Sequence, residues 1–283
     1  MKGVFFCFGL GYSAGFLARR LAAQGWTIAG TSREGATGPI ALHPFGRAIP
    51  LADAPRLLAA TTHLLISIPP DARGCPVYDI HGQDIPALER LHWIGYLSST
   101  NVYGNRAGGW VDETTPVAPG VERARRRVAA EAAWLALGQR SGIPVHVFRL
   151  AGIYGPGRSA LDALRAGTAR RIVKPGQVFS RIHVADLAAV LEAAMAQPRA
   201  GTVYNVCDDT PSPPEDVIDY AAALLGIAAP PLEDFATAAL SPMARSFFDD
   251  SKRVSNRRIK EELGVRLRYP SYREGLAALL EEE

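Results

Sequence analysis

The sequence predicts an α/β fold, a doubly wound parallel sheet with a smaller, mainly helical C-terminal lobe. Short apolar runs rich in β-branched and aromatic residues alternate with helix-length segments rich in Ala, Leu, Arg and Glu, as in repeated βαβ units. The apolar runs are continuous, as in strands that are covered on both faces. A chain of 283 residues also has room for about two domains.

The elements follow from this alternation. Continuous apolar runs such as 4–8 and 145–150 predict buried strands, and Ala/Leu-rich stretches such as 184–196 predict helices. The expected strands are 4–8, 26–31, a short piece near Ala48, 64–68, 93–97, 145–150 and 202–206. The expected helices are 13–23, 54–60, 85–91, 121–140 and 184–196. Consecutive strands joined by a helix should lie parallel in one sheet.

The character of the chain changes after Cys207. Residues 208–214 are polar and proline-rich, and the helical segments beyond them are joined by Pro230-Pro231 and Ser241-Pro242. A ligand cleft is expected at the carboxyl ends of the parallel strands, beside this lobe. The expected units are therefore 1–207, from which 156–181 project to the cleft, and the substrate lobe 208–283.

Composition excludes several classes of protein. Thirty-one basic and 28 acidic residues give a net charge of +3, too small for a nucleic-acid-binding face but compatible with small anionic ligands. Cys7, Cys75 and Cys207 have no metal-ligand or disulfide spacing, which predicts no metal site and a reducing, cytoplasmic setting. The N-terminal run 3–18 is interrupted by Gly9, Gly11 and Gly15 and is too short to cross a bilayer, so no membrane association is expected.

A glycine-rich turn follows the first predicted strand. Residues 9–14 read Gly-x-Gly-x-x-Ala between a strand and a helix. Gly9 allows the tight turn, Gly11 lets a pyrophosphate approach the backbone, and Ala14 permits close packing of helix and strand. This pattern predicts a Rossmann-like domain that binds a nicotinamide dinucleotide. The cofactor-binding candidates in this region are Gly9, Gly11, Tyr12, Ser13, Ala14 and Ile68.

The end of the second strand favours NADP(H) over NAD(H). NAD-binding proteins usually place an acid there for the ribose hydroxyls, whereas this chain has Thr31, Ser32 and Arg33. A guanidinium beside hydroxyl groups suits a 2′-phosphate, so Ser32 and Arg33 join the cofactor-binding candidates. The alternative is that Arg33 is solvated and that Glu34 supplies the acid.

Further motifs follow in a characteristic order. They are YLSSTNVYG at 96–104, WVDETTP at 110–116, RLAGIYGPGR at 149–158, RIHVADL at 181–187 and YNVCDD at 204–209. Together with the glycine turn they resemble the extended short-chain dehydrogenase/reductase family, the NAD(P)-dependent epimerase/dehydratase group. The resemblance covers nearly the whole chain. It implies a nicotinamide-dependent enzyme and, among known members, nucleotide-sugar substrates.

The resemblance implies roles for several polar residues. Ser99 corresponds to the family's catalytic serine, whose hydroxyl would hydrogen-bond the carbonyl or alkoxide oxygen of the substrate. Thr100 and Asn101 stand where dehydratases carry an acidic pair, which disfavours a sugar 4,6-dehydratase and leaves both as substrate candidates. Arg158 and Arg181 are further substrate candidates for phosphate or another anion. The alternative is that Arg181 pairs with Asp186 or faces solvent.

The chain departs from the family at the Tyr-x-x-x-Lys motif. Aligning the long helix on residues 129–131 places Arg123 at the Tyr position and Arg127 at the Lys position. Arg127 is still expected to grip the nicotinamide ribose. Arg123 cannot transfer a proton, because a guanidinium stays protonated at any working pH.

Two functions remain open. In the first, the protein is an NADP(H)-dependent oxidoreductase or epimerase whose acid/base group is Tyr103, Tyr154 or His183. In the second, the site is catalytically silent and the protein is an NADP(H)-binding sensor. The exchanged Tyr favours the sensor, whereas the retained Ser99 and the arginines of the lobe favour the enzyme. The resemblance also implies a homodimer through the long helix, whose apolar stretch 128–137 suits an interface.

Overall fold

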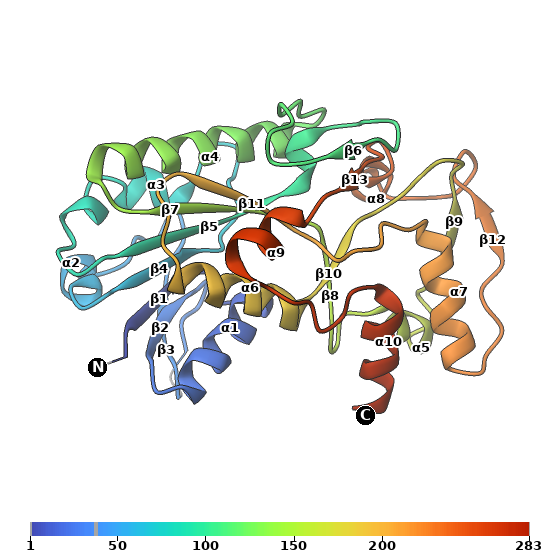
Figure 1. The fold of residues 1–283 in the computed structure, drawn as a ribbon, viewed down its shortest axis with the longest axis horizontal. Helices are drawn as coiled ribbons and strands as arrows, with labels where there is room; N and C mark the ends of the chain where they lie inside the picture. The colour runs from blue at the N-terminus through green and yellow to red at the C-terminus, as the bar shows by residue number, and fades with distance from the viewer. Residues whose placement is uncertain (1, 37–38, 283) are drawn as a thin grey trace. The chain divides into compact units, whose positions relative to one another are not determined.

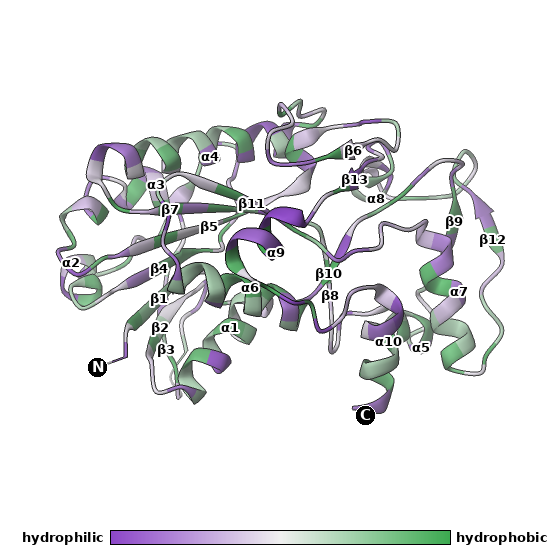
Figure 2. Ribbon diagram, viewed as in Figure 1, coloured by the Kyte–Doolittle hydropathy of each residue, from purple (hydrophilic) through white to green (hydrophobic). Residues whose placement is uncertain are grey.

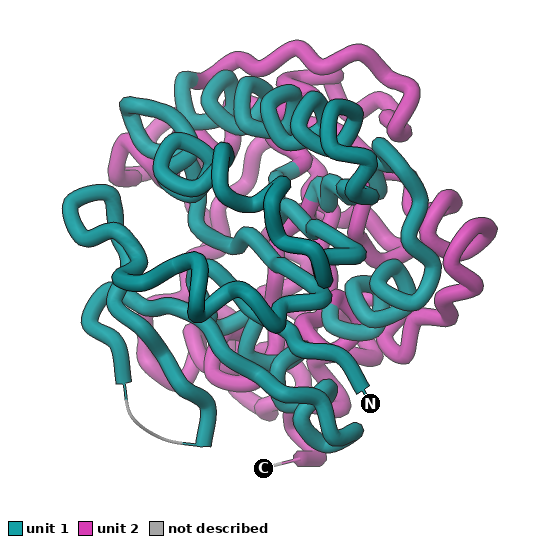
Figure 3. Tube along the Cα trace, turned by 90° about the vertical axis from the view of Figure 1, so that its left-hand side faces the viewer, with its two compact units in different colours: residues 1–99, 122–149, 188–204 teal, residues 100–121, 150–187, 205–283 magenta. Residues whose placement is uncertain are grey.

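The computed structural model describes residues 2–36 and 39–282. Two compact units share this chain, and each is assembled from three separated segments (Figure 3). Unit 1 contains Met1–Ser99, Glu122–Arg149 and Ala188–Tyr204, and unit 2 contains Thr100–Val121, Leu150–Leu187 and Asn205–Glu283. The predicted lobe 208–283 and the predicted projection 156–181 therefore fall in the same unit.

A seven-stranded sheet of order β11-β7-β5-β4-β1-β2-β3 confirms the predicted α/β class (Figure 1). Its strands are β1 (Val4–Phe8), β2 (Thr27–Ser32), β3 (Ala41–Pro44), β4 (His63–Ile66), β5 (Trp93–Ser99), β7 (Val145–Leu150) and β11 (Thr202–Val206). β1 pairs in parallel with β2 on one side, Phe5 opposite Ile28, and with β4 on the other, Phe5 opposite His63. The strand order reverses at β1, and such switch points are where open α/β sheets bind ligands.

Helices and a large apolar cluster complete unit 1. The helices are α1 (Tyr12–Ala23), α2 (Ala54–Leu58), α3 (Pro76–His81), the 3-10 turn η1 (Ile85–Ala87), α4 (Glu122–Ser141) and α6 (Val184–Ala196), which begins in unit 2. Phe8, Ile66 and Trp134 are among the completely buried members of the cluster. Hydrophilic and hydrophobic stretches alternate along α4 in Figure 2, as expected of a helix that is buried along one face.

Two predicted elements of unit 1 were wrong. The third strand is β3, residues 41–44, and not a piece near Ala48, because Gly46 and Ile49 exchange backbone hydrogen bonds and close a turn there. The helix expected at 85–91 is only the turn η1, since Leu88 is already extended. The sequence analysis also missed α3, although Pro76 at its first position is a typical helix start.

Unit 2 consists of short paired strands and helices. The parallel strand pairs are β8 (Gly152–Tyr154) with β10 (Arg181–His183), β9 (Arg171–Val173) with β12 (Leu232–Asp234), and β6 (Trp110–Val111) with β13 (Arg253–Val254). The helices are η2 (Thr100–Tyr103), α5 (Ala160–Arg165), α7 (Pro214–Leu224), α8 (Pro242–Phe247), α9 (Arg257–Leu263) and α10 (Tyr272–Glu281). Tyr154, Leu161 and Leu276 belong to the core that α5, α7 and α10 enclose. None of these short strand pairs was predicted, because three-residue strands leave no periodic signal.

The described ranges also bear on membrane, metal and disulfide chemistry. No helix within them is long and apolar enough to span a bilayer. Over the same ranges, no cluster of three or more His, Cys, Asp or Glu side chains could hold a metal ion. Cys7, Cys75 and Cys207 are buried free thiols.

Candidate functional site

The turn after β1 is shaped by two glycines with different roles. Gly9 has a φ of 84°, and a Cβ atom there would lie 2.6 Å from the Ile68 side chain. The Gly9 N–H donates to the Thr31 hydroxyl over 2.9 Å. Gly11 precedes α1, and apart from its chain neighbours no described atom lies within 4 Å of where its Cβ would stand. The space at Gly11 and the start of α1 therefore fit the pyrophosphate of a dinucleotide.

The end of β2 differs from the sequence-based interpretation in one respect. Thr31 is completely buried and its hydroxyl serves the glycine turn, so it does not face a phosphate. The half-buried Ser32 hydroxyl accepts a hydrogen bond from the Gly35 N–H over 2.8 Å. Arg33 and Glu34 are both exposed. Both side chains are therefore accessible to a ligand, and the role of each stays a prediction.

A buried charged group fixes the end of β5, the strand that carries Ser99. The Ser98 hydroxyl donates to Glu131 Oε1 over 2.5 Å, and Arg149 Nη2 donates to Glu131 Oε2 over 2.8 Å. Ser98, Glu131 and Arg149 are 3%, 4% and 7% exposed. The bonds join β5, α4 and β7 with the carboxylate satisfied at both oxygens, so the strand end is held rigidly.

The two arginines that replace the family's Tyr and Lys lie on the same helix as Glu131. Arg127 Nη1 donates to the Leu97 carbonyl over 2.8 Å, two residues before Ser99. Arg123, one turn earlier on α4, is half-buried. Arg123, Arg127 and Glu131 are spaced by four residues and therefore share one face of α4. This face binds the strand end instead of presenting a phenol.

The remaining strand-end candidates differ in accessibility. Ser99 is the half-buried last residue of β5 and continues directly into η2. Thr100 is buried and Asn101 is half-buried. Tyr103 is completely buried, and its hydroxyl donates to the Asn205 side-chain oxygen over 2.8 Å. A sealed phenol that already donates a hydrogen bond is poorly suited to exchange a proton with a substrate.

Unit 2 contains a pocket of about 470 Å³ that brings three predicted site residues together. Tyr154, Arg158 and Arg181 all line it. Arg158 is exposed, and Arg181 is held in place because its Nη1 donates to the Ser212 hydroxyl over 2.8 Å. Two guanidinium groups in one pocket suit an anionic ligand.

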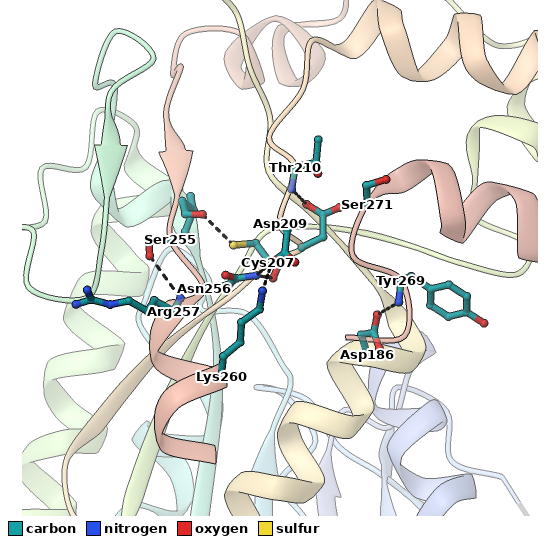
Figure 4. A network of polar contacts seen from close by, with 12 residues as sticks. Asp186, Cys207, Asp209, Thr210, Ser255, Asn256, Arg257, Lys260, Tyr269 and Ser271 are labelled. Atoms are coloured by element: carbon teal, nitrogen blue, oxygen red, sulfur yellow. Dashed lines mark hydrogen bonds and ion pairs between the residues drawn. The ribbon is translucent and has the colours of Figure 1, made fainter. Parts of the chain in front are cut away.

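The alternative pairing of Arg181 with Asp186 does not occur. Asp186 instead accepts the backbone N–H groups of Arg268 and Tyr269, over 2.8 Å and 2.9 Å. Figure 4 shows the Tyr269 N–H directed at this carboxylate. Asp186 therefore anchors the segment that leads into α10, and Arg181 is left to the pocket.

His183 and Tyr154 pack against each other beside that segment. The ring centroids of His183 lie 5.2 Å from Tyr154 and 4.1 Å from Tyr269. Burial, reinforced by Arg268, lowers the pKa of His183 to about 4, so the ring is neutral at neutral pH. Burial and nearby carboxylates, Asp208 foremost, raise the pKa of Tyr154 above its usual range. Neither group is tuned to act as a base near pH 7.

Asp208 is a candidate that the sequence analysis did not single out. It is 1% exposed, and its Oδ1 accepts the Thr210 N–H over 3.2 Å. Its Oδ2 has no hydrogen-bond partner in the described part of the chain. Burial raises the pKa of Asp208 to about 7, although the Thr210 N–H and Arg181 act in the opposite direction. A carboxyl group that titrates near neutral pH is typical of functional sites, but only tertiary burial could reveal this one.

The chain on both sides of Asp208 is tied to the C-terminal part of unit 2 (Figure 4). Asp209 Oδ1 accepts hydrogen bonds from Asn256 over 2.6 Å and from Lys260 over 2.5 Å. The Cys207 carbonyl accepts a second bond from Asn256 over 2.9 Å, and its thiol donates to the Val254 carbonyl over 3.1 Å. These contacts hold Asp208 in its buried position.

The comparisons with known proteins agree with this architecture. Residues 89–207 match the sequence profile of the NAD dependent epimerase/dehydratase family. A solved structure described as a putative NAD-dependent epimerase/dehydratase, from Methylobacillus flagellatus, is 26% identical over 100% of this chain and 99% of its own, with a TM-score of 0.70. Residues 89–207 therefore form a domain of the NAD-dependent epimerase/dehydratase family. Arg123 and Arg127 lie within this matched range.

Two other relatives of this epimerase/dehydratase chain carry no assigned activity in their descriptions. One is a functionally unknown conserved protein from Silicibacter pomeroyi DSS, whose structure is 52% identical over 99% of both chains with a TM-score of 0.90. The other is Protein YeeZ of Escherichia coli strain K12, 29% identical over 93% of this chain and 94% of its own. The fold is thus shared with the Silicibacter pomeroyi protein over 99% of both chains, and neither relative's description gives a substrate.

Proposed function

We propose that the protein is an NADP(H)-dependent oxidoreductase or epimerase that acts on a carbonyl or hydroxyl group of a small anionic, nucleotide-sugar-like substrate. The observation that carries the proposal is the turn after β1, where Gly11 leaves open space at the start of α1. Bound nicotinamide would accept or donate the hydride. The three unpaired cysteines favour the cytoplasm, where thiols stay reduced.

The chain's own residues would divide the work in this proposal. The glycine turn with Tyr12 and Ser13 would hold the pyrophosphate, and Ser32 and Arg33 would hold the 2′-phosphate. Ile68, which lies against Gly9, would border the cofactor. Ser99 would donate a hydrogen bond to the substrate oxygen, and Arg127, anchored to the Leu97 carbonyl, would face the nicotinamide ribose.

The cofactor assignment is tested by calorimetric titration with NADPH and NADH. We expect NADPH to bind about tenfold more tightly, the effect of one lost charge-assisted contact. Arg33→Ala should abolish this preference, and Glu34→Ala is the matched control on the neighbouring exposed residue. An unchanged ratio of NADPH affinity to NADH affinity in Arg33→Ala would contradict the assignment. A loss of NADH binding in Glu34→Ala would show that Glu34, and not Arg33, contacts the ribose.

A catalytically silent NADP(H)-binding sensor is the second candidate function. It is favoured because an arginine aligns with the position of the family's catalytic Tyr. Arg123 and Arg127 supply only guanidinium groups, and the Tyr103 phenol is sealed against Asn205. The test uses a panel of nucleotide sugars and keto-sugars, and it follows NADPH absorbance for net hydride transfer and chromatography of the sugars for epimerisation, which leaves NADPH unchanged. An enzyme should turn over at least one of them and lose most of this rate in Ser99→Ala. Tight NADPH binding without turnover of any panel member favours the sensor.

The substrate proposal concerns the pocket of unit 2. Arg158 and Arg181, which line this pocket, would bind phosphate groups. Thr100 and Asn101, which do not line it and directly follow Ser99, would contact the sugar. UDP and UDP-sugars should therefore protect the protein against thermal unfolding. Arg181→Gln should weaken this protection about tenfold in apparent affinity. Protection by UDP that is equal in wild type and Arg181→Gln would remove this residue from the site.

A further inference from the structure

A cluster of charged side chains lies in the loops at the carboxyl edge of the sheet. It is separate from the residues of the glycine turn and from Arg33. Arg47, in the loop after β3, donates from Nε and Nη2 to the two carboxylate oxygens of Asp71, over 2.6 Å and 2.9 Å. Its Nη2 also donates to Asp79 Oδ2 over 2.8 Å. Asp71 lies in the loop after β4 and Asp79 on α3. One guanidinium therefore joins three segments of unit 1.

Both loops also contact the end of β1. Phe45, directly after β3, packs against Phe8 with their ring centroids 4.9 Å apart, and Phe8 precedes Gly9. Ile68, in the loop after β4, lies against Gly9 itself. Arg47 is two residues from Phe45, and Asp71 is three from Ile68. The cluster is thus built on either side of the turn proposed to hold the dinucleotide.

The strand order assigns the loop that carries Arg47 to one half of the cofactor. β2 and β3 lie on one side of β1, and β4 and β5 on the other. The adenosine ribose is expected at the end of β2, beside Arg33, and β3 lies just outside β2. The loop that carries Arg47 is therefore expected to flank the adenosine. Ser99, at the end of β5, lies toward the nicotinamide half of the cofactor.

The cluster is geometrically well defined. The Arg47 side chain is only 18% exposed. Asp71 also accepts the Arg73 N–H over 2.8 Å, and it exchanges backbone hydrogen bonds with Gly74. Arg47 lowers the pKa of Asp71, so this carboxyl group stays ionised at neutral pH. A bidentate guanidinium–carboxylate pair fixes orientation as well as distance.

We propose that Arg47, Asp71 and Asp79 form an adenosine clamp. The ion pairs hold the loops after β3 and β4 in the arrangement that receives the adenosine half of the nicotinamide dinucleotide. Arg47 is a positioning residue in this role. The clamp rests on the proposed cofactor function, since without a dinucleotide it has nothing to position.

Calorimetry with 2′,5′-ADP and NADPH tests the clamp on the full chain. Arg47→Ala should weaken both ligands by the same factor, about tenfold, because both carry the adenosine half. Arg47→Lys keeps the charge but not the bidentate geometry, so it should lie between Arg47→Ala and wild type. Arg56→Ala is the matched control, since it removes one guanidinium from an exposed pair with Asp53, and it should change neither affinity more than about twofold.

The outcomes separate the clamp from the cofactor proposal. Unchanged 2′,5′-ADP affinity in folded Arg47→Ala overturns the clamp, as does weaker NADPH binding without weaker 2′,5′-ADP binding. Circular dichroism checks folding, and Asp79→Asn replaces Arg47→Ala under the same criteria if the latter does not fold. If the wild type prefers NADH, 5′-ADP takes the place of 2′,5′-ADP. A wild type that binds none of these ligands fails the proposed function itself, and the clamp with it.

Discussion

Single residues show how α4 is attached to the strand end that carries Ser99. On α4, Arg127 holds the Leu97 carbonyl and Glu131 holds the Ser98 hydroxyl. The helix therefore fixes the strand end that carries Ser99, but it presents no phenol there. Asp208 is a buried carboxyl whose pKa is raised to about 7, and its effect is expected on the pH dependence of stability.

Glu131→Gln should destabilise the protein by about 3 kcal/mol. The change leaves the buried Arg149 guanidinium without its counter-charge, which costs more than the loss of an exposed pair. Ser98→Ala removes a single hydrogen bond and should cost about 1 kcal/mol. Urea unfolding followed by tryptophan fluorescence measures both. Equal stability of Glu131→Gln and wild type would show that the charged group does not hold the strand end.

Asp208→Asn should stabilise the protein above pH 7 and have little effect near pH 4. The folded-state pKa of about 7 exceeds the ordinary 3.8, so the folded protein binds the extra proton between these values. The stabilisation that comes from the protonated Asp208 is then lost progressively as the pH rises from about 4 to 7. Asn at this position is neutral at every pH, so the variant is not destabilised in this range. The gain above pH 7 should be on the order of 3 kcal/mol. Unfolding free energies at pH 5 and pH 8 measure it, and a pH-independent difference would contradict it.

At the scale of elements, the β1–α1 turn followed directly from its sequence, whereas β3 and α3 did not. The turn depends on local conformations that only glycine adopts readily. β3 depends on pairing with β2, which no local pattern records, and the apparent helix at 85–91 is interrupted when Leu88 turns extended. Local rules therefore placed the cofactor turn correctly and failed where neighbouring segments determine the backbone.

Two glycine substitutions in the turn should have opposite effects. Gly11→Val meets no described neighbour and has an ordinary extended φ of −97°, so the fold should persist while NADPH affinity falls at least about tenfold. Gly9→Ala meets Ile68 at a φ of 84° and should cost about 2 kcal/mol of stability. Thermal melts and NADPH titrations measure the two effects. Normal NADPH binding by Gly11→Val would remove the pyrophosphate from this turn.

At the scale of the whole molecule, each unit is assembled from segments far apart in the sequence (Figure 3). The sequence analysis expected a boundary at residue 207, but segments 100–121 and 150–187 also belong to unit 2. The pocket that contains Arg158 and Arg181 illustrates the consequence, because α7 and α10, far along the chain, contribute Val217 and Leu276 to its wall. A linear division of the chain cannot describe such a site.

We expect the protein to be a homodimer in solution. The α4 helix exposes Ala129 and Ala132 and half-exposes Val128, Leu135 and Ala136, a small-residue surface that suits helix packing. Light scattering at micromolar concentration should give twice the chain mass of 30.3 kDa. Ala132→Glu should produce monomers, and Gln139→Glu, on the exposed end of α4, is the control. A monomeric wild type would exclude the dimer.

The sequence by itself determined the α/β class, the cofactor turn and the family, because apolar periodicity and glycine conformations are local properties of the chain. It also singled out Ser99, Arg33 and the arginines of α4, whose roles stay predictions. Only the tertiary structure showed that Glu131 holds Ser98, that Arg47 joins two loops, and that burial moves the pKa of Asp208 to about 7. Burial and long-range pairing depend on contacts between segments that are far apart in the sequence, and local sequence patterns do not predict those contacts.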